Sequence, residues 1–201
     1  MFSKQSTIRL NESLLISQLQ EGNPKAFGYL VENYQHRVFN TCLGVLRNAE
    51  DAEDIAQEVF VEVHRSVQNF KAESKLSTWI YRICVTKSLD HLRGKKRKKR
   101  FAFVKSIFGE GDNEPRFDIP DFVHPGVQLE NKERAAYLFK AIEQLPENQK
   151  VAFTLNKIEC LSYQEISEVT GMSVSAVESL LFRARQNLKK ILTDYYEENE
   201  K

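Results

Sequence analysis

The chain has 201 residues, which is enough for one medium domain or two small ones, and 41% of them are hydrophobic and 28% charged. This composition is typical of a folded globular protein and excludes a chain that is disordered throughout. The net charge is only +1, so overall charge by itself indicates no particular partner. No apolar run approaches the ~18 residues of a membrane span, and the first residues carry no export signal, so we expect a cytoplasmic protein.

Charge is nevertheless distributed in blocks along the chain. Residues 50–64 hold six carboxylates and no Lys or Arg. Residues 75–105 hold eleven Lys or Arg against one acid, and residues 106–133 reverse this with seven acids against two bases. Such blocks predict separate surfaces for separate partners.

The residue types that build metal and catalytic sites are scattered. Cys42, Cys84 and Cys160 lie far apart, no C-x-x-C pair occurs, and the four histidines are equally dispersed. Metal sites and disulfide frameworks need clustered ligands, so we expect neither. No Ser/His/Asp grouping, P-loop or pair of catalytic carboxylates can be identified. We therefore expect no enzyme, no cofactor and no small-molecule substrate.

Apolar residues recur with helical spacing from residue 11 to residue 98, and no alternating strand pattern is visible. The first clear stripe, over residues 27–38, follows Asn23, a candidate N-cap, and Pro24 at the first helical position. A second stripe covers residues 55–70. These patterns predict an N-terminal bundle of about four helices.

The last helix of this bundle is expected to begin near Leu76, with Ser74 or Ser77 as its N-cap. Trp79 shares the helical spacing of Leu76 and Ile80. We expect its ring in the core, the alternative being a wedge that helps to open DNA.

The helical pattern breaks near residue 100. Residues 108–127 contain three of the five prolines and three of the eight glycines, together with many acids, which indicates a linker without regular structure. We place this linker at residues 101–129, between domains at residues 1–100 and 130–201. The sequence thus predicts an all-α fold of two small helical domains joined by an irregular linker. The linker permits the domains to lie apart or folded on each other.

The strongest local signal lies in residues 161–192. Ser162 and Glu165 fit a capping box that opens a short helix, Gly171 suits a left-handed helix end, and Ser173 can cap a second helix. A short helix, a glycine turn and a longer helix predict a helix-turn-helix, whose second helix can enter a DNA major groove. The inward stripe of that second helix consists of Val177, Leu180 or Leu181, Ala184, Leu188 and Ile191.

The outward face of the same helix carries side chains that can read DNA bases. Arg pairs with guanine edges or phosphates, Glu accepts from cytosine, and an aromatic ring packs on the thymine methyl group. An exposed Phe182 favours this interpretation, the alternative being that its ring packs on the preceding helix. The candidate DNA contacts are Ser175, Glu178, Ser179, Phe182 and Arg183.

Three segments, in order, resemble the bacterial sigma factor family. Residues 51–70 resemble its region 2.2, with a D-x-x-Q-E-x-F core that includes Asp54, Gln57 and Glu58. Residues 75–93 resemble its regions 2.3 and 2.4, and residues 145–190 resemble region four, which reads the minus-thirty-five promoter element. The chain is thus similar to an RNA polymerase sigma factor of the sigma-70 family, of the two-domain extracytoplasmic-function (ECF) type.

The resemblance assigns partners to these surfaces. It implies that Asp54, Gln57 and Glu58 bind bacterial core RNA polymerase, and that the loop at residues 69–75 captures a base flipped out of the minus-ten element. The basic run at residues 93–100 is expected to be exposed, either meeting phosphates or solvated as a tail. The candidate minus-ten contacts are Asn69, Lys71, Lys75, Arg82, Lys87, His91 and Arg93.

The expected function is therefore that of a sigma factor, which binds core polymerase, recognises the minus-ten and minus-thirty-five elements of promoter DNA and promotes DNA opening. The resemblance also implies control by an anti-sigma factor, which in this family can be membrane-bound. An autonomous helix-turn-helix regulator that binds duplex DNA as a dimer is the alternative. A nucleic-acid-processing enzyme would need metal-binding acids, for which residues 50–64 are the one candidate segment.

Overall fold

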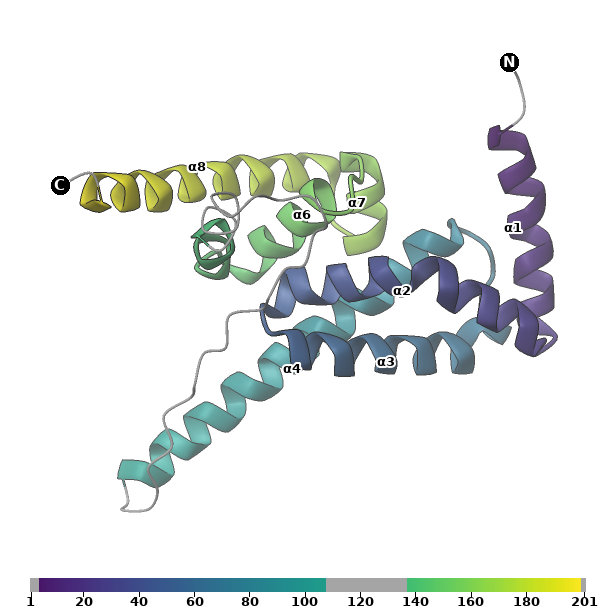
Figure 1. Cartoon of the computed structure of the whole chain (residues 1–201), viewed down its shortest axis with the longest axis horizontal. Coiled ribbons are helices and arrows are strands. Elements are labelled where there is room, and N and C mark those ends of the chain that lie inside the picture. The colour runs from purple at the N-terminus through teal and green to yellow at the C-terminus, as the bar shows by residue number, and fades with distance from the viewer. Residues whose placement is uncertain (1–3, 108–136, 200–201) are drawn as a thin grey trace.

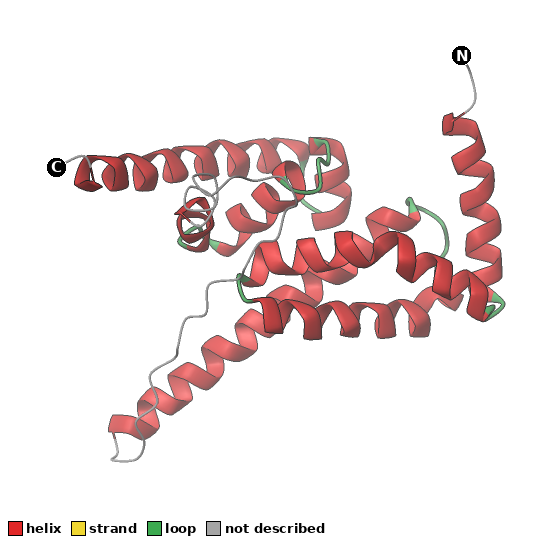
Figure 2. Ribbon diagram, viewed as in Figure 1, coloured by secondary structure: helices red, strands yellow, loops and turns green. Residues whose placement is uncertain are grey.

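The computed structural model describes residues 4–107 and 137–199, and every regular element within these ranges is a helix (Figure 2). The expected all-α fold is confirmed. Residues 137–143 are helical. The other helices are α1 (Lys4–Gln20), α2 (Pro24–Leu46), α3 (Ala49–Ser66), the short 3-10 helix η1 (Val67–Asn69), α4 (Leu76–Ile107), α6 (Glu147–Lys157), α7 (Tyr163–Thr170) and α8 (Val174–Asn199).

Helices α1–α4 form the predicted N-terminal bundle. Helices α2 and α3 lie side by side, both contact α4, and α1 packs against α2 and η1 at one end (Figure 1). The expected cap of α2 is confirmed, because the Asn23 side chain accepts a hydrogen bond from the Lys25 N–H at 2.9 Å and Pro24 opens the helix. Asn48 caps α3 in the same way, accepting from the Asp51 N–H at 2.7 Å.

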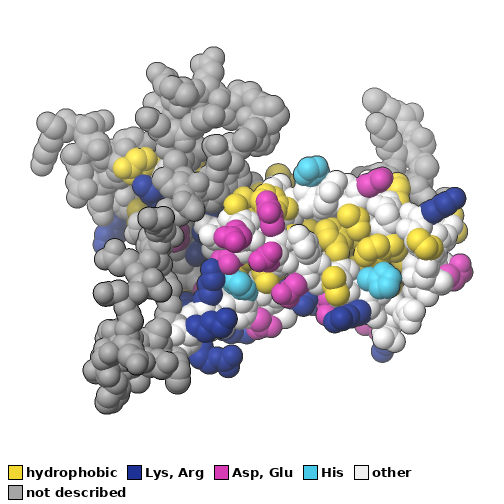
Figure 3. Space-filling model, turned by 60° about the horizontal axis from the view of Figure 1, so that its bottom comes forward, with side chains coloured by type: hydrophobic (Ala, Val, Ile, Leu, Met, Phe, Trp, Pro, Cys, Tyr) yellow, Lys and Arg dark blue, Asp and Glu magenta, His cyan; other side chains and the backbone are white. Residues whose placement is uncertain are grey.

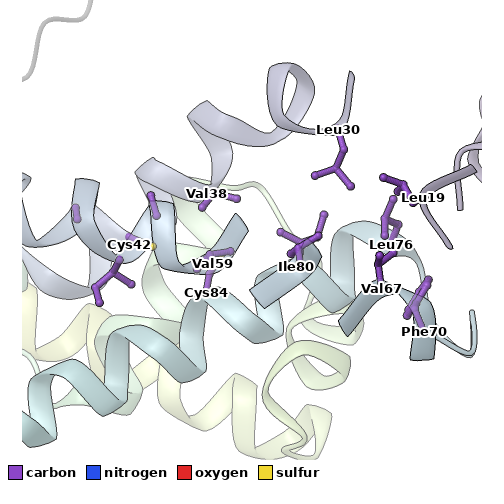
Figure 4. Close-up of a cluster of buried hydrophobic side chains, with 14 of the residues drawn as sticks. Leu19, Leu30, Val38, Cys42, Val59, Val67, Phe70, Leu76, Ile80 and Cys84 are labelled. Carbon is purple, nitrogen blue, oxygen red and sulfur yellow. The ribbon is translucent and has the colours of Figure 1, made fainter. Parts of the chain in front are cut away.

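The bundle encloses one apolar core (Figure 4). The Trp79 ring packs on this core, with its centroid 4.8 Å from that of Phe70, as expected of a core side chain. Two of the three free thiols, Cys42 and Cys84, are buried here, and Cys160 is exposed. The labelled core residues are Leu19, Leu30, Val38, Cys42, Val59, Val67, Phe70, Leu76, Ile80 and Cys84.

Helix α4 runs further than the sequence suggested. It continues to Ile107, whereas the linker was expected to begin at residue 101. Between Leu76 and Ile107 the chain has no proline and one glycine, Gly94, so nothing forces the helix to end at residue 100. Residues 108–129 of the expected linker lie outside the described residues. None of the described helices combines the length and the apolar content needed to cross a membrane.

The two domains are folded on each other, which is one of the two arrangements that the sequence left open. Helix α6 contacts α2, and α7 contacts α4. One apolar cluster crosses the boundary between the domains. Its buried members are Val45, Tyr81 and Val85 from the N-terminal domain and Val151, Ala152, Leu155, Ile166, Val169, Val177 and Leu181 from the C-terminal domain.

Candidate nucleic-acid interface

The helix-turn-helix forms through the local signals that predicted it. Ser162 accepts a hydrogen bond from the Glu165 N–H at 3.2 Å, and Glu165 accepts one from the Ser162 N–H at 3.0 Å, so the capping box is confirmed. Gly171 ends α7 with φ 72°, a left-handed conformation that glycine adopts without a Cβ clash. Ser173 then accepts from the Ala176 N–H at 3.2 Å at the start of α8.

Burial orients α8 as predicted. Four residues of the expected inward stripe are fully or almost fully buried: Val177, Leu181, Ala184 and Leu188. The opposite face points to solvent, and 59% of the Phe182 surface is exposed, so its ring does not pack on the preceding helix. The structure therefore presents all five candidate contacts on one exposed face: Ser175, Glu178, Ser179, Phe182 and Arg183.

Two further side chains belong to this face and were missed from the sequence. Tyr163 and Arg185 line a shallow hollow together with Glu178, Phe182 and Arg183. The Arg185 guanidinium donates to the Tyr163 hydroxyl at 3.1 Å, which ties the start of α7 to α8. Arg185 could have been predicted from the sequence, because it follows Phe182 by three positions and residues three apart are neighbours on a helix surface. No local sequence signal marks Tyr163 as part of this face.

The acidic helix α3 presents Asp54, Gln57 and Glu58 to solvent, as expected of a docking surface. Acidic side chains gather over this part of the molecule, with Lys and Arg side chains beside them (Figure 3). Lys87 of α4 lies beside this surface, with its Nζ 3.5 Å from Glu58 Oε2 and 3.9 Å from Glu62 Oε2. The polymerase candidates and one minus-ten candidate are thus adjacent.

The end of η1 and the loop that leads to α4 carry two more minus-ten candidates. Asn69 and Lys71 are both exposed. Ala72 adopts φ 54°, a left-handed conformation that costs a non-glycine residue about 1–3 kcal/mol. The shape of this loop is therefore held by its surroundings.

The cap of α4 differs from the one expected. Neither Ser74 nor Ser77 accepts a hydrogen bond from the first turn, and Ser74 Oγ instead donates to the Lys75 carbonyl at 3.5 Å. The Leu76 N–H donates to Glu12 Oε1 of α1 at 2.8 Å. A carboxylate from another helix satisfies this end of α4, and no local sequence pattern could have indicated it.

Two basic candidates at the start of α4 contact the helix-turn-helix. Lys75 Nζ donates to Glu165 Oε1 at 2.9 Å, and the Arg82 guanidinium donates to the Glu168 carbonyl at 2.7 Å. The hydrogen bond from Lys75, followed by those from Ser162, lowers the pKa of Glu165 to about 2. In this arrangement Lys75 and Arg82, two of the side chains that we expect to meet DNA, are bound to α7.

The remaining basic candidates lie further along α4. His91 Nε2 lies 3.1 Å from Asp51 Oδ1, and Arg93 donates to Asp90 at 2.9 Å. Residues 93 and 95–98 of the basic run are exposed, as expected. The structure thus brings the candidates together along the loop and α4, and pairs His91 and Lys95 with an acid of α3, Asp51.

Polar contacts reinforce the boundary between the domains. The Tyr81 hydroxyl donates to Glu159 Oε2 at 2.6 Å, and burial, followed by this hydrogen bond, raises the pKa of Tyr81. The Arg47 guanidinium lies 4.4 Å from the centre of the Phe139 ring and donates to the Phe139 carbonyl at 3.3 Å. Burial lowers the pKa of Arg47 to about 10. Lys96 of α4 also donates to Glu147 of α6 at 2.6 Å.

The two domains pack closely at Gly44 of α2. A Cβ placed on Gly44 would overlap Thr154 Cγ2 of α6 and would lie 2.8 Å from Thr154 Oγ1. Thr154 is fully buried, and its Cβ would also lie 3.1 Å from the added atom, which is a tight contact whichever way its side chain turns. The domains can therefore pack in this way because residue 44 has no side chain.

Sequence comparison identifies the same two regions. The family described as Sigma-70 region 2 matches residues 30–98, and the family described as Sigma-70, region 4 matches residues 135–188. The chain is 34% identical over 181 residues to the RNA polymerase sigma-H factor of Pseudomonas aeruginosa, covering 89% of this chain and 92% of that protein. It is 32% identical over 179 residues to the ECF RNA polymerase sigma-E factor of Escherichia coli, with the same coverage of both chains.

Solved structures share the fold. CnrH in complex with the cytosolic domain of CnrY matches with a TM-score of 0.64 at 22% identity, covering 91% of this chain and 97% of that one. The sigma factor RpoE of Bartonella quintana, in complex with the anti-sigma factor NepR, matches with a TM-score of 0.63 at 18% identity, covering 84% and 98%.

Proposed function

Because the chain belongs to the sigma-70 family of RNA polymerase sigma factors, we propose that it binds core RNA polymerase as an ECF sigma factor and directs it to promoters. The observation that carries this proposal is the presence of both matched regions, with the polymerase candidates of α3 and the candidate face of α8 both exposed. The chain then acts as a non-catalytic initiation subunit in the cytoplasm, where the polymerase works.

The docking surface on polymerase is assigned to Asp54, Gln57 and Glu58. All three are exposed on α3, and an acidic helix face can form charge-assisted hydrogen bonds with a basic partner surface. Helix α8 is assigned to the minus-thirty-five element, because a free helix face with an arginine and an exposed ring suits a major groove. The loop at residues 69–75 and α4 are assigned to the minus-ten element, whose exposed strand needs positive charge along its backbone.

Binding of the minus-ten element requires the two domains to separate. Both Lys75 and Arg82 face α7 in the folded arrangement, so a DNA strand that meets both of them has to take the place of α7. The folded arrangement is therefore a resting form, and core polymerase binds the form in which α7 has left α4. Separation of α7 from α4 in the polymerase-bound form would explain why the protein acts on promoters together with polymerase.

Control by an anti-sigma factor is part of the same proposal. RpoE of Bartonella quintana, which shares the fold, was solved with the anti-sigma factor NepR. A partner that stabilises the folded arrangement would keep Lys75 and Arg82 away from DNA without touching either side chain.

The polymerase assignment is tested by reversing one charge on α3. We expect Asp54→Lys to weaken binding to core polymerase by about tenfold or more, which corresponds to about 1.4 kcal/mol. Titration of fluorescently labelled protein with core polymerase at two salt concentrations measures the effect. Glu53→Lys is the matched control, because Glu53 is also exposed on α3 and undergoes the same charge change. Equal losses in both variants would show a response to bulk charge alone and would contradict the assignment.

A further inference from the structure

Helix α1 contacts both ends of the loop that precedes α4. Gln20 Nε2 donates to the Phe70 carbonyl at 2.9 Å, and Glu12 Oε1 accepts from the Leu76 N–H at 2.8 Å. The partners are 50 and 64 residues apart in sequence, so neither contact follows from local structure. Glu12 and Gln20 are eight positions apart on one helix, a rise of about 12 Å, so α1 spans the loop from end to end.

The contact from Glu12 stabilises the start of α4. The first helical hydrogen bond of α4 runs from the Trp79 N–H to the carbonyl of Lys75, the residue before the helix, at 3.1 Å, so the Leu76 N–H has no partner inside the helix. A carboxylate is a strong acceptor at this position, because it also opposes the positive end of the helix dipole. Glu12 therefore fixes the point at which the loop ends and α4 begins.

The loop between these contacts does not favour its own shape. Ala72 is held at φ 54° although it carries a Cβ. On the inner side, the Phe70 ring packs 4.8 Å from the Trp79 ring, while Asn69 and Lys71 remain exposed. Loss of either end contact would let the strained segment relax and change where the exposed side chains point.

We propose that Glu12 and Gln20 are positioning residues that preorganise the loop at residues 69–75 for the unpaired minus-ten strand. The inference rests on the proposed function, because it assumes that this loop meets DNA. A loop held in its bound shape loses less conformational entropy when it captures a base, and it presents one geometry against which a wrong base can be rejected. When the domains separate, Lys75 loses its contact with α7, and α1 continues to hold the loop.

Base preference is the readout that distinguishes positioning from general support. The holoenzyme, made from the full chain and core polymerase, is incubated with single-stranded DNA about eight nucleotides long, randomised at every position, and the bound strands are sequenced. We expect Glu12→Ala and Gln20→Ala each to reduce the enrichment of preferred over average sequences by about tenfold, with core affinity unchanged. Glu12→Gln keeps an oxygen acceptor for the Leu76 N–H, so it should retain most of the preference.

The control is Glu21→Ala, which removes an exposed carboxylate beside the end of α1 whose hydrogen-bond partner is Ser17 and not the loop. Unchanged enrichment in both alanine variants overturns the proposal, as does Glu12→Gln losing preference as fully as Glu12→Ala. A proportional loss of core affinity and DNA binding with the preference intact also overturns it, because that pattern indicates a purely structural role. If Glu12→Ala does not fold, Gln20→Ala decides the outcome. A wild-type holoenzyme without any base preference would instead contradict the proposed function itself.

Discussion

Replacing Gly44 with alanine is expected to separate the two domains while the N-terminal bundle stays folded. The new Cβ would overlap Thr154 Cγ2 and lie 3.1 Å from Thr154 Cβ, so a change of rotamer at this buried residue does not remove the whole clash and the helices have to move apart. Overpacking of this kind costs about 1–3 kcal/mol, which would shift the equilibrium toward the open form by roughly 5- to 150-fold. Within α2 itself alanine is favoured over glycine by about 1 kcal/mol, so the helix gains stability.

Small-angle X-ray scattering measures this change as an increase in the radius of gyration. Gly28→Ala is the matched control, because Gly28 lies on the same helix and a Cβ there meets nothing within 4 Å. Adding Thr154→Ala to Gly44→Ala should restore part of the compact form, since it removes the atoms that the new Cβ overlaps. A Gly44→Ala protein as compact as the wild type would show that the contact between α2 and α6 does not hold the domains together.

The second large effect is expected on the exposed face of α8. Arg183→Ala and Phe182→Ala each remove a group able to contact a base edge, and one good contact of this kind contributes about 1–3 kcal/mol of discrimination. Each variant should therefore lose tenfold or more of its activity on promoters that carry the minus-thirty-five element. Arg183→Lys keeps the charge but loses the planar, forked guanidinium group. It should therefore recover less than half of the free energy of binding that Arg183→Ala loses.

Transcription from matched promoters with and without the minus-thirty-five element measures this effect. Lys189→Ala is the control, since Lys189 is exposed on α8 but lies outside the candidate face. The wild type should distinguish the two promoters strongly, and the Phe182 and Arg183 variants weakly. If Lys189→Ala is as impaired as Arg183→Ala, the face acts through charge alone and the assignment of base contacts is wrong.

The elements that the sequence predicted best are those with local causes. The capping box of Ser162 and Glu165, the left-handed Gly171 and the caps at Asn23 and Ser173 each depend on residues a few positions apart. The exposed ring of Phe182 follows from helical periodicity in the same way. These signals fixed the helix-turn-helix and the face that it presents.

The features that the sequence could not predict depend on long-range contacts. The acceptor for the first N–H of α4 is Glu12, 64 residues away, and no pattern near Ser74 or Ser77 indicates it. The close packing at Gly44 depends on Thr154 in the other domain, and a glycine within a helix does not by itself reveal a neighbour.

The same limit applies to the predicted DNA contacts. The candidate residues could be selected from charge and family resemblance. The groups within the folded chain that these residues contact could not be predicted in this way. Lys75 and Arg82 contact α7, and Lys87 lies beside Glu58. The contacts of Lys75 and Arg82 depend on how the domains pack after each has folded, which a linker of this kind leaves open. The contact of Lys87 depends on how α3 and α4 pack within the N-terminal bundle.

Run-off transcription with purified bacterial core polymerase, with and without the protein, on a promoter library at fixed salt shows whether the protein directs polymerase to promoters. We expect transcripts that appear only when the protein is present, from start sites that share two spaced sequence elements. Absence of core binding and of transcripts, together with tight binding of the protein alone to duplex DNA, would contradict it and would indicate an autonomous regulator.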